Sequence, residues 1–196
     1  GNVPLRQGLP NLRRVQSALH TDWPLFAGCH TALDGQPRKS TAFYGADGLG
    51  DVPSVWPYST DHPPDDSPCQ ECSAAEAIVA AAVSHPNALR IVALGPLTNI
   101  ARALVIDAEL PSKVECLVIM GGTCRGEGNV TAAAEYNWWF DPEAAASVLA
   151  AFPTVTVVPW ETALDCPVRW EEVEEWHSGV NSRTAIFFRD ILGMFL

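Results

Sequence analysis

The stretch VECLVIMGGTCRGEGNVTAAAEYNWWFDPEAA, residues 114–145, decides the fold of this chain. Its apolar beginning, residues 114–120, predicts a buried strand that ends in two glycines. A polar and aromatic loop follows, and Asp141-Pro142-Glu143 then predicts the start of an alanine-rich helix. A buried strand that leads into a polar loop is the place where open α/β sheets bind their ligands.

Carboxamide and carboxylate side chains gather in this loop. Asn129, Glu135 and Asn137 stand among the rings of Tyr136 and Trp138. Carboxamides, one carboxylate and flat rings suit a neutral, hydroxyl-rich ligand with a ring better than a phosphate. Such residues also occur as solvated turn formers or in cores, so the spacing by itself leaves both interpretations open.

Strands and helices alternate on both sides of this stretch. Apolar runs at residues 89–94 and 155–159 predict two further strands. Ser73 and Glu76 have the spacing of a capping box, which predicts a helix through about His85.

Other segments complete the pattern. Pro96 suits the first position of a helix, residues 10–19 predict a short helix, and residues 168–195 predict two helices. Residues 23–28 predict a short strand. Strands that alternate with helices predict one α/β domain over residues 1–196, with a mostly parallel, doubly wound sheet.

Composition limits the classes of partner. The chain has 196 residues, 12 basic against 23 acidic, and a formal net charge of −11. It lacks a cluster of Lys and Arg, which argues against a nucleic acid or another polyanion as partner. The sequence has no apolar run of membrane-spanning length and no visible signal peptide, so we expect no membrane association.

Six cysteines are present, and only Cys69 and Cys72 form a C-x-x-C pair. A zinc ribbon needs a second pair, so free thiols in a reducing compartment are the favoured interpretation, which predicts a cytoplasmic location. Cys116 and Cys166 have the surroundings of small buried hydrophobic residues.

Glycine-rich segments invite a search for phosphate loops. Residues 121–126 lack the Lys-Ser/Thr pair of a Walker loop, and residues 126–128 lack the third glycine of a dinucleotide fingerprint. A Gly-x-Ser-x-Gly elbow is also missing. Residues 44–51 form another glycine-rich segment, which we interpret either as a loop beside a site or as a plain surface excursion.

A collinear set of motifs resembles the nucleoside hydrolases that prefer inosine and uridine. In chain order, the motifs are Gly1–Leu5, Gly45–Gly50, Ala93–Ala101, Ile119–Gly122, Gly128–Asn129, Ala134–Asn137 and Asp141–Ala145. The resemblance spans residues 1 to about 167. It implies hydrolysis of the N-glycosidic bond of ribonucleosides to free base and ribose, a reaction of purine and pyrimidine salvage.

The resemblance also implies a set of site residues. A bound Ca²⁺ would activate the water, with the backbone carbonyl of Thr98 as one ligand. Asn129, Glu135 and Asn137 would bind the ribose, and Asn2 would lie at the edge of the site. A homo-oligomer of the full-length form is expected as well.

Two family segments would fall outside these residues. The family's Asp-x-Asp-x-x-x-Asp-Asp, which supplies the Asp base and most calcium ligands, would precede Gly1, and a His-Asp segment would follow Leu196. We therefore expect a chain truncated at both ends, with no catalytic base of its own. Asp65 and Asp66 are interpreted as a solvated pair rather than as a substitute.

Two other functions remain open. One is a non-catalytic nucleoside- or ribose-binding protein, or an inert truncated member of the family. The other is an interaction module that acts through the acidic segment 170–176.

Overall fold

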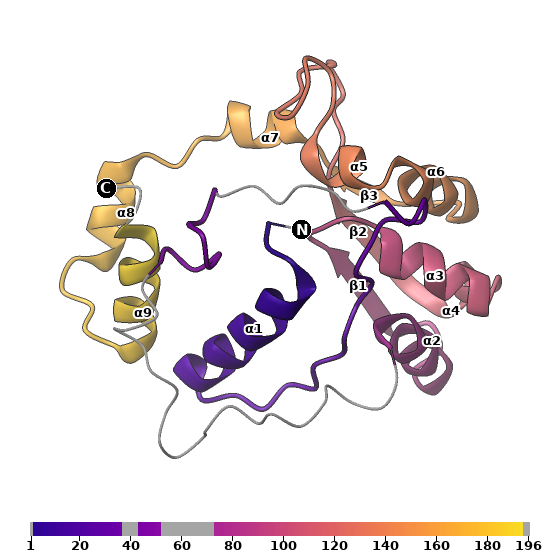
Figure 1. Ribbon diagram of the computed structural model, residues 1–196, viewed down its shortest axis with the longest axis horizontal. Coiled ribbons are helices and arrows are strands. Elements are labelled where there is room, and N and C mark those ends of the chain that lie inside the picture. Colours follow the sequence, from indigo (N-terminus) through magenta and orange to yellow (C-terminus); the bar gives the residue numbers. More distant parts are fainter. Residues whose placement is uncertain (1, 37–42, 52–72, 194–196) are drawn as a thin grey trace. The chain divides into compact units, whose positions relative to one another are not determined.

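The structure, a computed structural model, describes residues 2–36, 43–51 and 73–193, apart from the side chain of His177 (Figure 1). The chain forms two compact units. The first contains the described residues 26–36 and 73–167, and the second contains 2–25, 43–51 and 168–193.

A parallel sheet lies at the centre of the first unit. Its strands are β1 (Leu89–Ala93), β2 (Val114–Met120) and β3 (Thr156–Val158), in the order β1-β2-β3. Ala93 is opposite Ile119, and Met120 is opposite Val158, so the three strands end together at one edge. Loops that follow these strands therefore meet at the carboxyl edge of the sheet.

Helices connect and cover the strands. In chain order they are α2 (Ala74–Ser84), α3 (Thr98–Ile106), α4 (Leu110–Lys113), α5 (Tyr136–Phe140), α6 (Pro142–Ala151) and α7 (Trp160–Asp165). Helix α3 packs between α2 and α6, and Figure 1 shows the three side by side along the sheet.

The core of this unit lies between the sheet and these helices. Leu117 and Ile119 of β2 are fully buried, together with Leu97, Leu110 and Val148 from the surrounding segments. Each such side chain contributes about 1.5–3 kcal/mol through burial. Val92 of β1 is 61% exposed, so alternate positions of that strand point away from the core.

One buried carboxylate joins three segments of the unit. Asp141 is 0% exposed and caps α6 by accepting a hydrogen bond from the amide of Ala144, 3.1 Å away. It also accepts from the hydroxyl of Thr98 at 2.6 Å and from the amide of Leu33 at 2.9 Å. A segment at residues 26–34, which we call the strap, is thereby held against α3 and α6.

The second unit is helical. It contains α1 (Leu5–Leu19), α8 (Trp170–His177) and α9 (Arg183–Leu192). Helix α1 packs against α9 through Ala18, Phe187 and Ile191. The two helices predicted within residues 168–195 are therefore confirmed.

Most expectations for the fold are confirmed. The sheet is parallel, the strand at residues 114–120 has the predicted bounds, and Asp141 caps a helix that starts at Pro142. The capping box of Ser73 and Glu76 is present at the start of α2. Among the described residues, no helix is long and apolar enough to cross a membrane.

Four details differ from expectation. The strand predicted at residues 23–28 is absent; the strap, which begins within this segment, bonds through the Cys29 amide to the side chain of Asn99 and through the Leu33 amide to Asp141 rather than to a sheet. Helix α1 begins at Leu5 rather than at residue 10, with Pro10 inside it. Helix α3 starts two residues after Pro96. Cys166 is exposed rather than buried, whereas Cys116 is half-buried.

Some expectations fall outside the part of the chain that the structure describes. These concern the Cys69–Cys72 pair and the Asp65–Asp66 pair.

Replacement of Asp141 by Ala tests the role of its carboxylate. The change leaves two amides and a hydroxyl without their acceptor, so we expect the free energy of unfolding to fall by about 3 kcal/mol. Urea denaturation followed by circular dichroism measures this loss. Glu143→Ala, an exposed change in the same helix, is the control and should cost less than about 1 kcal/mol. Equal losses in the two variants would contradict the assigned role.

Candidate functional site

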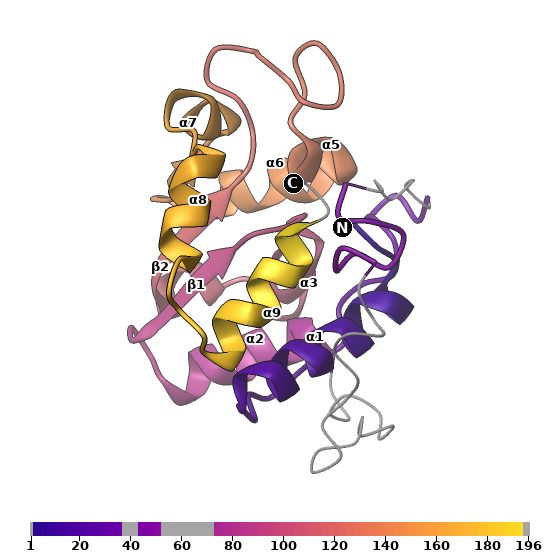
Figure 2. The ribbon, with the colours of Figure 1, turned by 90° about the vertical axis from the view of Figure 1, so that its left-hand side faces the viewer.

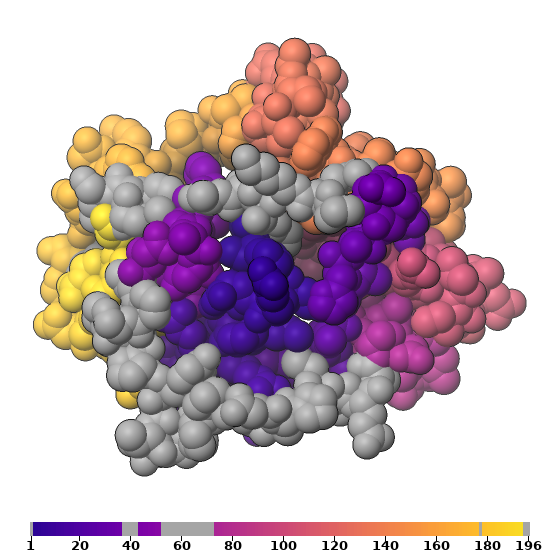
Figure 3. Space-filling view, in the orientation of Figure 1, coloured from indigo at the N-terminus to yellow at the C-terminus, as the bar shows by residue number. Residues whose placement is uncertain are grey.

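The candidate site lies where β2 ends. The β2–α5 loop, residues 121–135, leaves the sheet at this edge and returns to start α5. Figure 2 shows the loop extending beyond the sheet between α7 and α5. In the space-filling view its tip forms a protrusion, and the residues around the tip are exposed (Figure 3).

Glu135 organises the base of this loop. Its carboxylate caps α5 by accepting from the amides of Asn137 at 2.8 Å and Trp138 at 3.2 Å. It also accepts from the amide of Gly122 at 2.9 Å, which joins the two ends of the loop. The residue is 2% exposed. Three of about four acceptor positions of a carboxylate are thereby filled, and one position on Oε1 is left for another donor.

Asn137 joins two strand ends. Its Nδ2 group donates to the backbone carbonyl of Met120, 3.1 Å away, and lies 3.5 Å from the carbonyl of Leu94. Within the described residues, its Oδ1 atom accepts no hydrogen bond. The donors of this carboxamide are therefore used in the structure, while its acceptor is available to a ligand.

Asn129 has the opposite arrangement. Its Oδ1 atom accepts from the amide of Tyr136 at 2.8 Å, which brings the exposed side chain to the start of α5. Its Nδ2 group has no partner in the part of the chain that the structure describes. Asn129 thus offers donors and Asn137 offers an acceptor, which suits a ligand with several hydroxyl groups.

Two glycines allow the backbone to take this path. Gly122 has a φ of 72°, and a Cβ atom there would lie 2.7 Å from the ring of Trp138. A Cβ atom at Gly128 would overlap the carbonyl oxygen of Thr131 and the backbone nitrogen of Ala134. Only glycine fits this closely packed turn, which places Asn129.

Helix α7 holds the first arm of the loop. Oε1 of Glu161 accepts from the amides of Cys124 at 2.8 Å and Arg125 at 2.6 Å. The guanidinium of Arg125 also makes two hydrogen bonds, of 2.8 and 2.9 Å, with Asp165.

Burial tends to raise the pKa of Glu161, but the amides of Arg125 and Cys124 and the Arg125 charge outweigh it, so the pKa lies below its usual value. No sequence motif singled out Glu161 as a site residue. Its position directly after a predicted strand, at the same edge of the sheet, was the available signal.

Thr98 lies apart from this group. It is the first residue of α3 and is 5% exposed, and its hydroxyl is bonded to Asp141. Among the described residues, no hydrogen bond joins Thr98 to Asn129, Glu135 or Asn137. Asn2 belongs to the second unit.

A calcium site does not fit the described residues by themselves. Ca²⁺ takes six to eight oxygen ligands. Within residues 2–36, 43–51 and 73–193, no group of three or more His, Cys, Asp or Glu side chains could hold a metal ion. The carbonyl of Thr98 alone does not make such a site.

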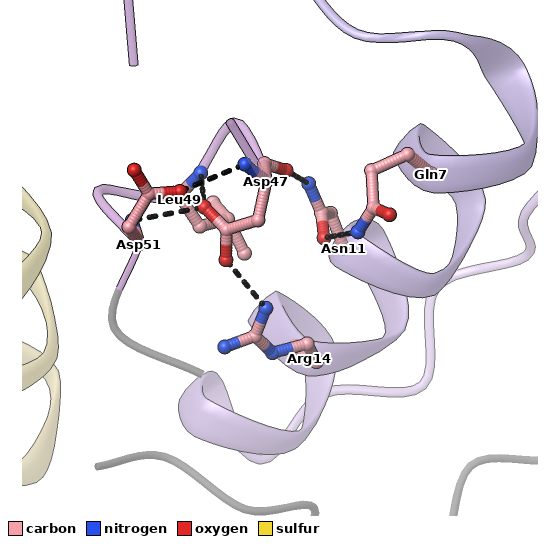
Figure 4. Close-up of polar contacts among 6 residues, drawn as sticks. All are labelled: Gln7, Asn11, Arg14, Asp47, Leu49 and Asp51. Atoms are coloured by element: carbon pink, nitrogen blue, oxygen red, sulfur yellow. Dashed lines mark hydrogen bonds and ion pairs between the residues drawn. The ribbon is translucent and has the colours of Figure 1, made fainter. Parts of the chain in front are cut away.

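The glycine-rich segment 44–51 is a folded turn within the second unit. Oδ1 of Asp47 accepts from the amides of Leu49 at 2.8 Å and Asp51 at 2.9 Å, and Oδ2 accepts from Arg14 at 3.3 Å (Figure 4). The amide of Asp47 donates in turn to Asp51. These amides are occupied by carboxylates, so they do not form a cradle for a phosphate.

Comparisons with known proteins agree with the family resemblance of the sequence. The family model described as inosine-uridine preferring nucleoside hydrolase matches residues 1–196. Uridine nucleosidase 1 of Arabidopsis thaliana is 34% identical over 198 residues, which cover 97% of this chain and 56% of the relative. The pyrimidine-specific ribonucleoside hydrolase RihA of Escherichia coli is 30% identical over 197 residues, with 100% of this chain and 60% of the relative covered.

Solved structures are similar as well. The plant nucleoside hydrolase PpNRh1 gives a TM-score of 0.87 at 28% identity, covering 100% of this chain and 59% of that one. A purine-preferring ribonucleoside hydrolase from Gardnerella vaginalis gives 0.87 at 27% identity, with 100% and 60% covered. The chain thus spans about 60% of the length of each of these four proteins.

Acid should loosen the turn at Asp47. Burial tends to raise the pKa of this carboxyl, but the amides of Leu49 and Asp51 and the Arg14 charge hold the pKa below its usual value. Its contribution is therefore complete above about pH 4 and is lost as the pH falls through the lowered pKa. We expect Asp47→Asn to speed hydrogen exchange of the Leu49 and Asp51 amides at pH 7 by about tenfold, and by progressively less as the pH is lowered through the pKa of Asp47. An effect that does not change with pH would contradict this assignment.

Gly128 offers a test of the loop turn. Gly128→Ala should open the turn and lower the free energy of unfolding by about 2 kcal/mol, because backbone atoms fill the space that the new Cβ needs. Gly126→Asn is the matched control, since Gly126 has open space and a φ of 75° that Asn tolerates. Thermal unfolding compares the two variants, and a control as unstable as Gly128→Ala would refute the steric explanation.

Proposed function

This chain belongs to the inosine-uridine preferring nucleoside hydrolase family, and from that membership we propose that the native protein hydrolyses the N-glycosidic bond of ribonucleosides to free base and ribose. One observation carries the proposal for this chain's own residues. Asn129 of the β2–α5 loop and Asn137 of α5 flank the buried Glu135 in the sequence, and within the described residues the Nδ2 group of Asn129 and the Oδ1 atom of Asn137 make no hydrogen bond.

The three side chains would divide the binding of the ribose. Asn137 Oδ1 would accept from one sugar hydroxyl, and Asn129 Nδ2 would donate to another. The open acceptor position of Glu135 would take a third. Cleavage of a glycosidic bond passes through a state that resembles an oxocarbenium ion, so contacts that orient the ring hydroxyls lower the barrier.

The aromatic residues of α5 would form one wall. Tyr136 lies with its ring centroid 5.9 Å from that of Phe140 and 6.3 Å from that of Trp139. Trp138 packs on Gly121 and Gly122 at the strand end. We assign to Asn2 a place at the edge of the site, as the family resemblance implies.

Calcium is part of the proposal for the native protein only. The described residues would contribute the Thr98 carbonyl, which does not suffice to hold the ion. When bound, a calcium ion would make a water molecule more acidic. The catalytic base is likewise not assigned to any residue of this chain.

The preferred base is proposed from the relatives. The two sequence relatives described above are named for uridine or pyrimidine ribonucleosides. One solved structure is titled as purine-preferring. We propose uridine as the first substrate, with inosine as the alternative. We further propose that the native protein is a cytoplasmic homo-oligomer that serves nucleoside salvage, and that residues 1–196 form part of one hydrolase domain.

A second function is favoured by one observation. The described residues include the carboxamides and carboxylate proposed to bind the sugar, but no group of three or more His, Cys, Asp or Glu side chains that could hold a metal ion. Binding of ribose or nucleoside without cleavage is therefore the alternative for this chain by itself. Calorimetry with ribose, combined with a chromatographic assay for free base, separates binding from cleavage.

Release of uracil and ribose from uridine by the native protein tests the main proposal. Asn137→Ala should lower kcat/KM by about ten- to a hundredfold, since one hydrogen bond to the sugar is lost. Asn87→Gly is the control, because Asn87 lies before the amino end of β1 with a left-handed φ of 58° that glycine adopts without strain. A native protein that releases no base from any ribonucleoside would refute the proposal.

A further inference from the structure

Helix α7 is tied to the β2–α5 loop at several points. The amide of Trp160 donates to the carbonyl of Gly122 at 3.0 Å, so the helix begins directly beside the end of β2. Glu161, the next residue, and Asp165, one helical turn further, both bond to the first arm of the loop. Figure 2 shows α7 next to this arm.

Glu161 makes the stronger of the two side-chain attachments. A single oxygen, Oε1, accepts from two successive amides, those of Cys124 and Arg125. The residue is 3% exposed, so water is largely excluded from these bonds. Hydrogen bonds to a buried carboxylate are about twice as strong as those between neutral groups.

The second carboxylate oxygen of Glu161, Oε2, accepts no backbone amide among the described residues. Oε2 is buried and has no hydrogen-bond partner among the described residues. Burial of an unpaired carboxylate oxygen costs free energy. The two hydrogen bonds to Oε1 and the charge of the nearby Arg125 offset this cost.

The ion pair of Arg125 and Asp165 makes the weaker attachment. Arg125 is 48% exposed and Asp165 is 56% exposed. Exposed pairs contribute about 0–1 kcal/mol because water and salt screen them. Loss of Asp165 should therefore matter much less than loss of Glu161.

Between the segments bonded to Glu161 and Glu135, the loop is stabilised mainly by hydrogen bonds within its own backbone. Glu161 fixes Cys124 and Arg125 at the start, and Glu135 fixes the end through Gly122 and α5. The turn between them closes on its own backbone, with the amide of Asn129 donating to the carbonyl of Ala134 at 3.1 Å. Asn129 thus lies between the two segments of the loop that the carboxylates hold.

We propose that Glu161 is a positioning residue that holds the β2–α5 loop, and with it Asn129, in the conformation that binds the ribose. This inference rests on the proposed function, because it assigns Glu161 a role in binding that substrate. Glu161 acts through the loop backbone and touches neither substrate nor reacting atoms.

Two substitutions of Glu161 distinguish the effect of its hydrogen-bond acceptor from the effect of its side-chain volume. Glu161→Gln keeps a carbonyl oxygen that can accept from Cys124 and Arg125. Glu161→Met keeps similar volume but removes the acceptor. Glu127→Gln, at a 56% exposed position on the same loop, controls for loss of one negative charge, and Asp165→Asn removes only the weaker attachment.

Steady-state kinetics of the native protein with uridine provides the first readout. Glu161→Met should raise KM about tenfold with kcat within about twofold, since the misplaced loop weakens ground-state and transition-state binding alike. Glu161→Gln should stay within about threefold of the unmodified protein, and both control variants within about twofold. A merely structural role would lower the amount of folded enzyme and leave KM unchanged.

Hydrogen exchange provides the second readout, independent of turnover. Glu161→Met should speed exchange of the Cys124 and Arg125 amides by at least about tenfold. In the unmodified protein, saturating ribose should slow the same two amides, because coupling between two sites is reciprocal. This measurement keeps the test valid even if Glu161→Met does not fold.

The outcomes distinguish the two proposals. Unchanged KM in Glu161→Met, or ribose binding without any slower exchange at Cys124 and Arg125, overturns the role of Glu161 while cleavage of uridine still stands. An unmodified protein that binds ribose, slows these amides and cleaves no nucleoside contradicts the proposed function but supports the positioning role.

Discussion

The hydrogen bond between the Glu135 carboxylate and the amide of Gly122 is the interaction on which the site depends. It connects the last residue of the β2–α5 loop to the second residue after β2, so that the loop leaves and returns at one point of the sheet edge. The same carboxylate starts α5 and thereby orients Asn137. Without this bond, α5 would be joined to the end of β2 mainly by the hydrogen bond from Asn137 to Met120 and by the packing of Trp138, and the two asparagines would be held less firmly together.

Three buried carboxylates share this way of acting. Asp141, Glu135 and Glu161 are 0%, 2% and 3% exposed, and each accepts from two or more backbone amides. In the part of the chain that the structure describes, none of the three forms a salt bridge, whereas Asp165 pairs with Arg125 at the surface. Backbone amides are fixed by secondary structure, so they satisfy a buried anion without the entropy needed to order a long cationic side chain. The carboxyl edge of the sheet is held together by polar groups, while Leu117 and Ile119 supply the apolar core beneath it.

Local patterns predicted most of the fold. The apolar run at residues 114–120, the capping box at Ser73 and the Asp141-Pro142 start of α6 each carry their signal within a few residues, and each was predicted correctly. The strap was not, because its conformation depends on Asn99 and Asp141, which lie 70 and 108 residues further along the chain. Asn129, Glu135 and Asn137 could be selected by chemistry and resemblance. The hydrogen bonds that occupy Oδ1 of Asn129 and Nδ2 of Asn137 depend on the folded structure and could not be predicted from the sequence. The same holds for the hydrogen bonds from the loop to Glu161.

The packing of Trp138 has an optical consequence. Its indole ring lies against Gly121 and Gly122, and its Nε1 atom is buried without a partner among the described residues. An indole shielded from water emits at shorter wavelength than an exposed one, such as Trp176, which is 62% exposed. The chain has seven tryptophans, and this one stands at the end of β2 directly beside Glu135. A variant that keeps Trp138 as its single tryptophan would therefore report on the state of the strand end without any attached dye.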